Sequence, residues 1–256
     1  MLWHILDSSS GQVLVVLACA LVFAGMMKGI IGVGMPIVAL PLLSMLIDVR
    51  AAVMLLAMPL ILSNIPQALE GGRTLECFKR LIPVLLGMMP GVLLGVTILL
   101  ATNPGTTKAL AGSAIVVVAG LTWLAPKFKL RENLKAPIGL GAGFAGGVLG
   151  GVAALPGPLV FTYLLAKGLR GKEFTKEASL FLVLSSALLA LSLASSSMFD
   201  GTDLAISTTA LIPVAIGMFF GQKLRDLIPA DAFRKAVLGV VLLSGVGIIV
   251  KAGLPF

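Results

Sequence analysis

Phe23-Ala-Gly-Met-Met-Lys-Gly-Ile-Ile-Gly-Val-Gly-Met-Pro36 interrupts a long apolar run with glycines, a lysine and a proline. A second stretch, Phe144-Ala-Gly-Gly-Val-Leu-Gly-Gly-Val-Ala-Ala-Leu-Pro-Gly-Pro158, repeats its Phe-Ala-Gly beginning and its proline-containing end. Glycine allows close backbone approach and positive φ, and proline is tolerated in the first turn of a helix. We therefore predict that each stretch forms two short helices that meet at a break inside a membrane.

The composition around these stretches is that of a polytopic membrane protein. Of the 256 residues, 58% are hydrophobic and 12% are charged, whereas a soluble domain is about half apolar and about a quarter charged. The net charge of +8 falls between apolar runs, so it indicates topology in a lipid bilayer rather than a nucleic-acid partner. No Lys or Arg precedes the first apolar run, so a cleaved signal peptide is not expected.

The apolar runs form two sets of five, separated by a charged connector at residues 127–135. The predicted segments are 12–28, 33–47, 51–69, 80–101 and 106–125, then 136–150, 156–167, 177–199, 205–222 and 232–251. Short words recur in the same order in both sets, such as Leu-Ile-Pro-Val at Leu81 and Leu211, and Lys-Ala at Lys108 and Lys235. This recurrence predicts an internal duplication within one integral membrane domain, with residues 1–126 as repeat 1 and residues 136–256 as repeat 2.

Charge predicts how the repeats are inserted. Cytoplasmic loops collect Lys and Arg, and the rich connections are 73–80, 127–135, 167–176 and 223–235. The poor ones are the N-terminus, 48–50, 102–108 and 200–203. The two kinds alternate correctly only if the first two segments of each repeat return to the side from which they start. We therefore predict an all-α membrane protein with two inverted-topology repeats and both termini outside.

How far the first two segments of each repeat cross the membrane is left open by the sequence. These segments are short, so they are either tilted full crossings or helical hairpins that reach partway.

Helix starts at the two breaks are candidate anion sites. They offer unpaired backbone N–H groups and the positive end of the helix dipole, which in hydrocarbon must face protein or a solvated cavity. The alternative is that their Gly-x-x-x-Gly words only let helices pack closely. The candidate lining residues are Gly29, Gly32, Gly34, Pro36, Gly150, Gly151, Pro156, Gly157 and Pro158.

Lys28 is the cation placed within the first paired unit, away from both of its ends. Burying a lone ammonium is costly, so we expect it to pair with backbone carbonyls, with a carboxylate from a distant segment or with an anionic substrate. Snorkelling to a surface is the alternative. Asn64 and Ser185 interrupt the third segment of each repeat, where they suit either a permeating oxyanion or interhelical hydrogen bonds.

Several chemistries are excluded or poorly supported. The histidine content is His4 alone, which excludes a Ser-His-Asp triad and a histidine zinc site. No phosphate-binding loop for ATP is present, and we predict neither a metal nor a cofactor. Glu70 and Glu177 remain candidates for a proton relay, and the two cysteines are expected to serve packing.

The chain resembles the TauE/SafE family of sulfite and organosulfonate exporters of bacterial inner membranes. The resemblance rests on Ala24-Gly25-x-x-x-Gly29-x-x-Gly32-x-Gly34-x-Pro36, followed by Ala39-Leu-Pro41, and on its copy at 144–158. It implies export of a small anion such as sulfite or a C2–C3 sulfonate. The usual run of consecutive glycines is replaced by Gly32-Val-Gly-Met-Pro36, and the copy has Ala153-Ala154 where glycine is common, so a carboxylate or another oxyanion also fits.

We therefore expect a secondary transporter of the inner membrane that exports a small anion bound near the midplane, with a proton or sodium as a possible coupling ion. A passive anion channel is the alternative function. An intramembrane enzyme is a third, and the lack of a histidine within the apolar runs counts against it.

Overall fold

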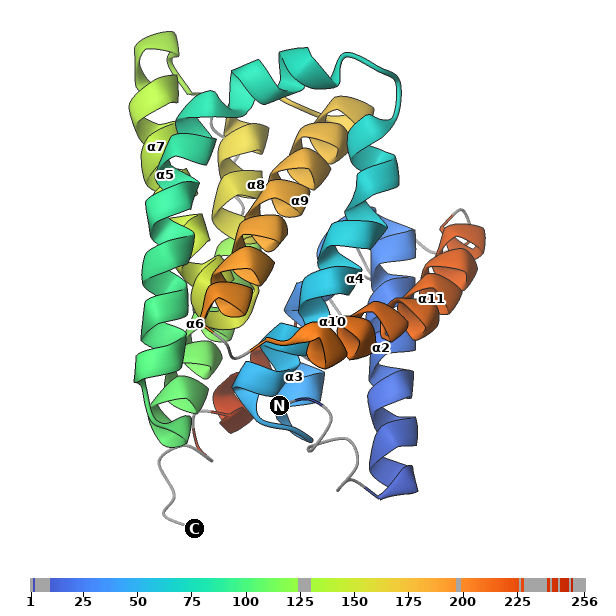
Figure 1. Cartoon of the computed structure of the whole chain (residues 1–256). Helices are drawn as coiled ribbons and strands as arrows, with labels where there is room; N and C mark the ends of the chain where they lie inside the picture. The colour runs from blue at the N-terminus through green and yellow to red at the C-terminus, as the bar shows by residue number, and fades with distance from the viewer. Residues whose placement is uncertain are drawn as a thin grey trace.

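The computed structural model of the chain describes residues 2, 10–123, 130–196, 199–225, 227, 239, 241–243, 245–248 and 250. Within these residues all regular structure is α-helical (Figure 1). The helices are α2 (Gly11–Ile31), α3 (Met35–Ser44), α4 (Val49–Leu69), α5 (Thr74–Ala101), α6 (Pro104–Trp123), α7 (Glu132–Ala153), α8 (Gly157–Ala166), α9 (Gly171–Ser195), α10 (Gly201–Thr209) and α11 (Leu211–Leu224).

Six helical stretches in the described part of the chain are long and apolar enough to cross a membrane. They are α2, α4, α5, Asn133–Ala153 of α7, α9 and the α10–α11 stretch Gly201–Leu224. By contrast, α3 and α8 have 10 residues each, which corresponds to about 15 Å, half of the hydrocarbon thickness. The prediction of an all-α, multi-pass membrane protein is confirmed.

The predicted breaks are present in both stretches, but only the second helix of each pair is short. The first helices, α2 and α7, have 21 and 22 residues, so the expectation of two short helices was wrong for them. Several of their glycines lie within the helix and face the backbone of a neighbouring helix: Gly25, Gly29, Gly143, Gly147 and Gly151. The breaks fall after these glycines, between Ile31 and Met35 and between Ala153 and Gly157.

Two other predicted segments need comment. The segment expected at 205–222 consists of two helices, α10 and α11, which meet at Ala210. The segment expected at 232–251 lies largely outside the described residues.

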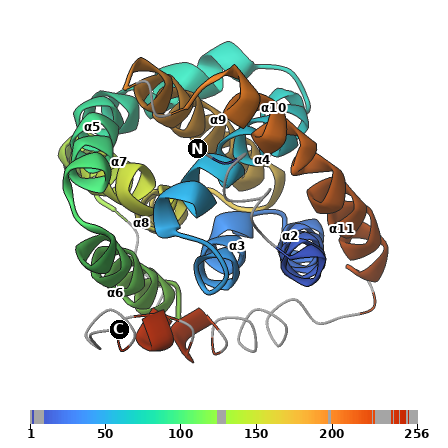
Figure 2. The same ribbon diagram turned by 60° about the horizontal axis from the view of Figure 1, so that its bottom comes forward.

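Helices from the two halves of the sequence pack reciprocally. The first-half helix α5 lies against α7, the second-half helix α11 lies against α2, and α4 lies against α9. Figures 1 and 2 show the α5–α7 pair and the α2–α11 pair on opposite sides of α4 and α9. Each broken helix is therefore held by a helix of the other half.

Glycines bring the helices of both outer pairs into backbone contact. Gly87, Gly91 and Gly95 of α5 lie against the backbone of α7, and Gly217 and Gly221 of α11 lie against that of α2. A Cβ at any of these positions would collide with a carbonyl group of the partner helix. These glycines thus serve helix packing, as small residues do in membranes.

The same contacts define the register between the two halves. Gly25 lies against the carbonyl of Val214, and Gly143 lies against the carbonyl of Val84. Because Val84 and Val214 occupy the same place in the two Leu-Ile-Pro-Val words, Gly25 corresponds to Gly143. Counted from the breaks, the left-handed Gly32 corresponds to Ala154, so α7 has four more residues than α2 between this contact and its break, about one helical turn.

Lys- and Arg-rich connections meet at one end of the molecule, at the top of Figure 1. Lys167 Nζ donates to the carbonyl of Arg80 at 3.4 Å, and the Leu130 N–H donates to the carbonyl of Ala166 at 2.9 Å. The second bond joins the residues just before α7 to the last residue of α8. The hairpin formed by α7 and α8 therefore begins and ends at this end of the molecule. We call this region the basic end, defined by residues 73–80, 130–135 and 167–176.

The connections poor in Lys and Arg lie at the opposite end. Arg50, after the α3–α4 turn, donates from Nε to the carbonyl of Leu99 at 3.0 Å and from Nη2 to that of Thr102. The Leu2 N–H donates to Asp203 Oδ1 at 2.6 Å. The α2–α3 hairpin begins and ends on this side of the molecule (Figure 1).

The glycine contacts can be tested with two substitutions on α7. Gly147→Ala places a Cβ against the backbone of α5, and we expect it to lower the free energy of unfolding by about 1–3 kcal/mol. Gly141 has no neighbouring atom within 4 Å of its ideal Cβ, so Gly141→Ala should be neutral or stabilising by up to about 1 kcal/mol. Thermal unfolding of the purified protein in detergent measures both; equal melting temperatures would contradict the close contact.

Candidate functional site

The first break is built by two glycines with positive φ. Gly32 ends α2 with φ 93°, and its N–H donates to the carbonyl of Lys28 at 2.7 Å. Gly34 precedes α3 with φ 97°, and Pro36 is in the first turn of that helix. Because a side chain in the left-handed region costs about 1–2 kcal/mol, this reversal favours glycine at both positions.

Two side chains donate to carbonyl groups of this break, and a third orients one of them. Gln67 of α4 donates from Nε2 to the carbonyl of Gly32 at 3.1 Å, and Ser179 of α9 donates to Gln67 Oε1 at 3.1 Å. Arg225, at the end of α11, donates from Nε to the carbonyl of Ile30 at 3.0 Å. Carbonyl groups at a helix end in a membrane need such partners.

Lys28 lies in the last turn of α2 and is 2% exposed. Its Nζ donates to Ser63 Oγ at 2.9 Å and to Asn64 Oδ1 at 2.6 Å, both on α4. The Asn64 amide donates in turn to the carbonyl of Leu60 at 2.7 Å, which fixes the amide oxygen toward the ammonium. Lys28 is thus paired, as expected, but its partners are hydroxyl and amide oxygens rather than backbone carbonyls or a carboxylate. Its burial contradicts snorkelling.

The ammonium of Lys28 has hydrogen bonds but no negative charge from these partners. An ammonium has three donors, and within the described part of the chain two of them are used. A buried charge with neutral partners is costly unless a counter-charge is present. The arrangement therefore suits an anion as the remaining ligand of Lys28.

The second break has the same design with different residues. Ala154 ends α7 with φ 53°, and its N–H donates to the carbonyl of Gly150 at 2.9 Å. The following helix α8 begins at Gly157 with Pro158 in its first turn, and its cap residue Pro156 provides no side-chain hydrogen bond. A left-handed alanine costs about 1–2 kcal/mol, so here the departure from glycine carries a conformational penalty.

Gly150 is the counterpart of Lys28, because each lies four residues before the left-handed residue that ends its helix. Ser185 Oγ lies 3.4 Å from the position that a Cβ on Gly150 would take. The neighbouring Ser186 Oγ is buried and has no hydrogen-bond partner among the described residues. The second break therefore has the buried hydroxyl group of Ser185 at the place where the first break has the ammonium of Lys28.

The predicted site residues thus fall into three groups. Lys28 and Asn64 are in contact beside the first break, which contains Gly32, Gly34 and Pro36. Gly150 and Ser185 lie together beside the second break, which contains Pro156, Gly157 and Pro158. Gly29 and Gly151 face the backbones of α11 and α5, so we assign these two to helix packing.

The sequence analysis missed two residues that shape the first break, Ser179 and Arg225. Arg225 belongs to a Lys- and Arg-rich connection, which by itself predicts only the side of the membrane. A cation just beyond an apolar helix is also suited to bind carbonyl groups at the end of another helix. In the part of the chain that the structure describes, no three His, Cys, Asp or Glu side chains cluster as a metal site would require.

The Lys28–Asn64 contact predicts strong coupling between the two side chains. Asn64→Leu leaves the buried ammonium with Ser63 alone, and we expect a loss of about 3–5 kcal/mol in unfolding free energy. The double variant Lys28→Met/Asn64→Leu removes the charge as well and should be clearly more stable than Asn64→Leu. Thermal or denaturant unfolding of the two single variants and the double variant in detergent measures the coupling. If their losses in unfolding free energy simply add, the two side chains are not in contact.

The chain matches the model of a known protein family. The model of the family described as Sulfite exporter TauE/SafE matches residues 17–248 of the chain, which include both breaks. The comparison with curated proteins gave no match, and the comparison with solved structures gave none.

Proposed function

We propose an anion-export function for this chain, which belongs to the sulfite exporter TauE/SafE family. Membership and the six apolar helices make it a multi-pass membrane transporter. The specific proposal is that it is a secondary transporter of a small oxyanion, such as sulfite or a C2–C3 sulfonate. A small carboxylate is a competing substrate because it offers the same charge and the same acceptor oxygens.

The observation that carries this proposal is the buried ammonium of Lys28 beside a helix break. Its contacts with Ser63 and Asn64 orient it, but they leave its charge without compensation. The start of α3 adds the positive end of its helix dipole and the N–H groups that precede Pro36, because Pro36 has no N–H and the Ile37 N–H donates to the carbonyl of Gly34 at 3.1 Å. An oxyanion would supply both the missing charge and the acceptor oxygens.

We propose further that residues 1–126 and 136–256 are inverted-topology repeats joined by the connector 127–135. Three features support this: the order of a long, a short and a long helix in each half, the reciprocal packing, and the hairpins that begin at opposite ends. Such repeats bind substrates between them in many secondary transporters. The second break, with Gly150 and Ser185, would then contribute the uncharged side of the site.

The proposed direction is outward across the bacterial inner membrane, with the basic end in the cytoplasm. Cytoplasmic loops are rich in Lys and Arg. With a negative interior, leaving the cell is favourable for an anion by about 2.3 kcal/mol per charge per 100 mV. Export therefore needs no ATP, and proton or sodium coupling would add to this driving force or oppose it.

Flux measurements in proteoliposomes test the proposed function. A carrier should show saturable sulfite flux, competition by methanesulfonate and accelerated exchange when substrate is present on both sides. Flux that rises linearly with substrate and shows no counterflow would instead indicate a channel. Absence of flux for every small oxyanion tried would overturn the proposal.

The role of Lys28 has its own test. Lys28→Met should lower the kcat/KM for sulfite flux by at least about tenfold, equivalent to 1.4 kcal/mol, because the buried counter-charge of the anion is lost. Lys223→Met is the matched control, since Lys223 lies over the Phe219 ring, 4.3 Å from its centroid, and should transport normally. Equal flux in the Lys28→Met variant and the wild type would remove Lys28 from the site.

A further inference from the structure

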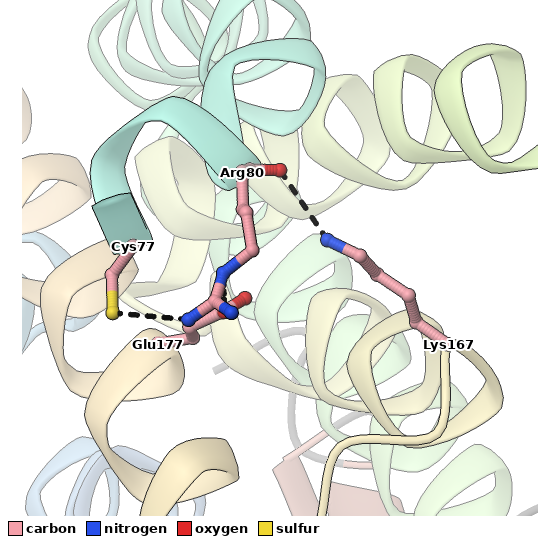
Figure 3. A network of polar contacts seen from close by, with 4 residues as sticks. All are labelled: Cys77, Arg80, Lys167 and Glu177. Atoms are coloured by element: carbon pink, nitrogen blue, oxygen red, sulfur yellow. Dashed lines mark hydrogen bonds and ion pairs between the residues drawn. The ribbon is translucent and has the colours of Figure 1, made fainter. Parts of the chain in front are cut away.

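An ion pair at the basic end joins the two halves of the protein. Arg80, in the first turns of α5, has its Nε 2.8 Å from Oε1 of Glu177 on α9 (Figure 3). The Glu177 side chain is fully buried, whereas 44% of the Arg80 side chain is exposed. The carboxylate is thus fixed in the protein, and the guanidinium reaches it from a position open to solvent.

The charges of Lys167 and Arg80 both favour the Glu177 carboxylate, and the Arg80 guanidinium lies 2.8 Å from it. The ion pair is close but lies outside hydrogen-bond geometry, and neither carboxylate oxygen has a hydrogen bond within the described residues. Lys167, Glu173 and Tyr163 also interact electrostatically with Glu177. The Lys167 ammonium also donates to the carbonyl of Arg80 at 3.4 Å, so both cations belong to one polar cluster around Glu177 (Figure 3).

A cavity of about 250 Å³ lies beside the exposed part of Arg80 and is open on one side. Four cations and three carboxylates line it, together with Gly71, Gly72 and Cys77; the charged residues are Arg73, Arg80, Lys172, Lys176, Glu70, Glu76 and Glu173. Neither α5 nor α9, which begin here, has a side-chain cap on its first N–H groups. Lys172 pairs with Glu70 and Lys176 donates to the carbonyl of Glu70, so Arg80 and Arg73 are the cations of this mixed-charge cavity to which a small anion would bind.

Apart from the ion pair with Glu177, the side-chain contact of Arg80 is weak, so its guanidinium can bind another partner in this cavity. Besides the ion pair, its Nη2 donates to Cys77 Sγ at 3.4 Å, a weak acceptor. An oxyanion would offer the guanidinium two oxygens in the fork geometry that arginine binds best. The cost of this exchange falls on Glu177, which would remain buried after losing one of the two positive charges that favour its carboxylate, those of Arg80 and Lys167.

We propose that the Arg80–Glu177 pair is a partner-exchange site, in which a small oxyanion binds Arg80 in the cavity and Glu177 takes up a proton. The proton passes from water to the Glu177 carboxylate, Arg80 keeps its charge, and no covalent bond of the anion is formed or broken. This inference rests on the proposed function and adds an entrance site at the basic end. It also links anion binding to proton uptake.

The linkage is measurable as proton uptake during anion binding. Methanesulfonate is the probe, because unlike sulfite it does not itself take up a proton near neutral pH. Titrated into weakly buffered full-length protein in detergent, it should cause proton uptake by the wild type. Its apparent dissociation constant should rise with pH, by up to about tenfold per unit above neutrality, since binding takes up as much as one proton.

Substitutions assign the proton. Glu177→Gln should bind methanesulfonate without proton uptake, whereas Glu173→Gln, which alters an exposed carboxylate one turn earlier on α9, should retain the uptake. Arg80→Gln should lose both the binding at the cavity and the uptake. In Lys28→Met the uptake should persist, which separates this cavity from the site at the first break.

Two results would overturn the partner exchange. One is methanesulfonate binding without proton uptake by the wild type, and the other is undiminished uptake by Glu177→Gln. If saturable flux that depends on Lys28 is found at the same time, the proposed transport function stands and only the exchange fails. If neither flux nor anion binding is observed, both proposals fail.

Discussion

Backbone contact between glycine-rich helices is the constraint on which the rest of this structure depends. In a bilayer, lipid is as apolar as leucine, so helices associate through close packing and internal hydrogen bonds. Here α5 holds α7 and α11 holds α2, and each contact joins one half of the chain to the other. As a result, the broken helix of each half is fixed by the opposite half, and the breaks can remain inside the protein without being exposed to lipid.

The two breaks have nearly the same backbone but different electrostatics. Each ends a long helix with a left-handed residue and begins a short helix with proline in its first turn. The first has the ammonium of Lys28, bound by neutral oxygens, whereas the second has Gly150 and the Ser185 hydroxyl group at the corresponding place. Among the described residues, two breaks of similar backbone thus differ in charge, and the cation that would attract an anion lies beside the first.

Charge at the basic end is arranged differently from charge at the first break. Among the described residues, Lys28 is a buried cation with neutral partners, and Glu177 is a buried anion that is opposed by the charges of a half-exposed arginine and of Lys167. A small anion would therefore complete the first arrangement and disrupt the second.

The amino-acid sequence was sufficient to predict the all-helical membrane class, both breaks and the unusual position of Lys28. These depend on local properties: apolar length, the φ requirements of glycine and proline, and the cost of a charge within an apolar run. The three-dimensional arrangement was needed to show that Ser63 and Asn64 bind Lys28, that Gly25 and Gly143 contact Val214 and Val84, and that Gly29 and Gly151 face other helices. It was also needed to show that Arg80 reaches Glu177. Such pairings depend on which faces of distant helices meet, and a glycine-rich apolar helix offers little periodicity from which a sequence could specify its buried face.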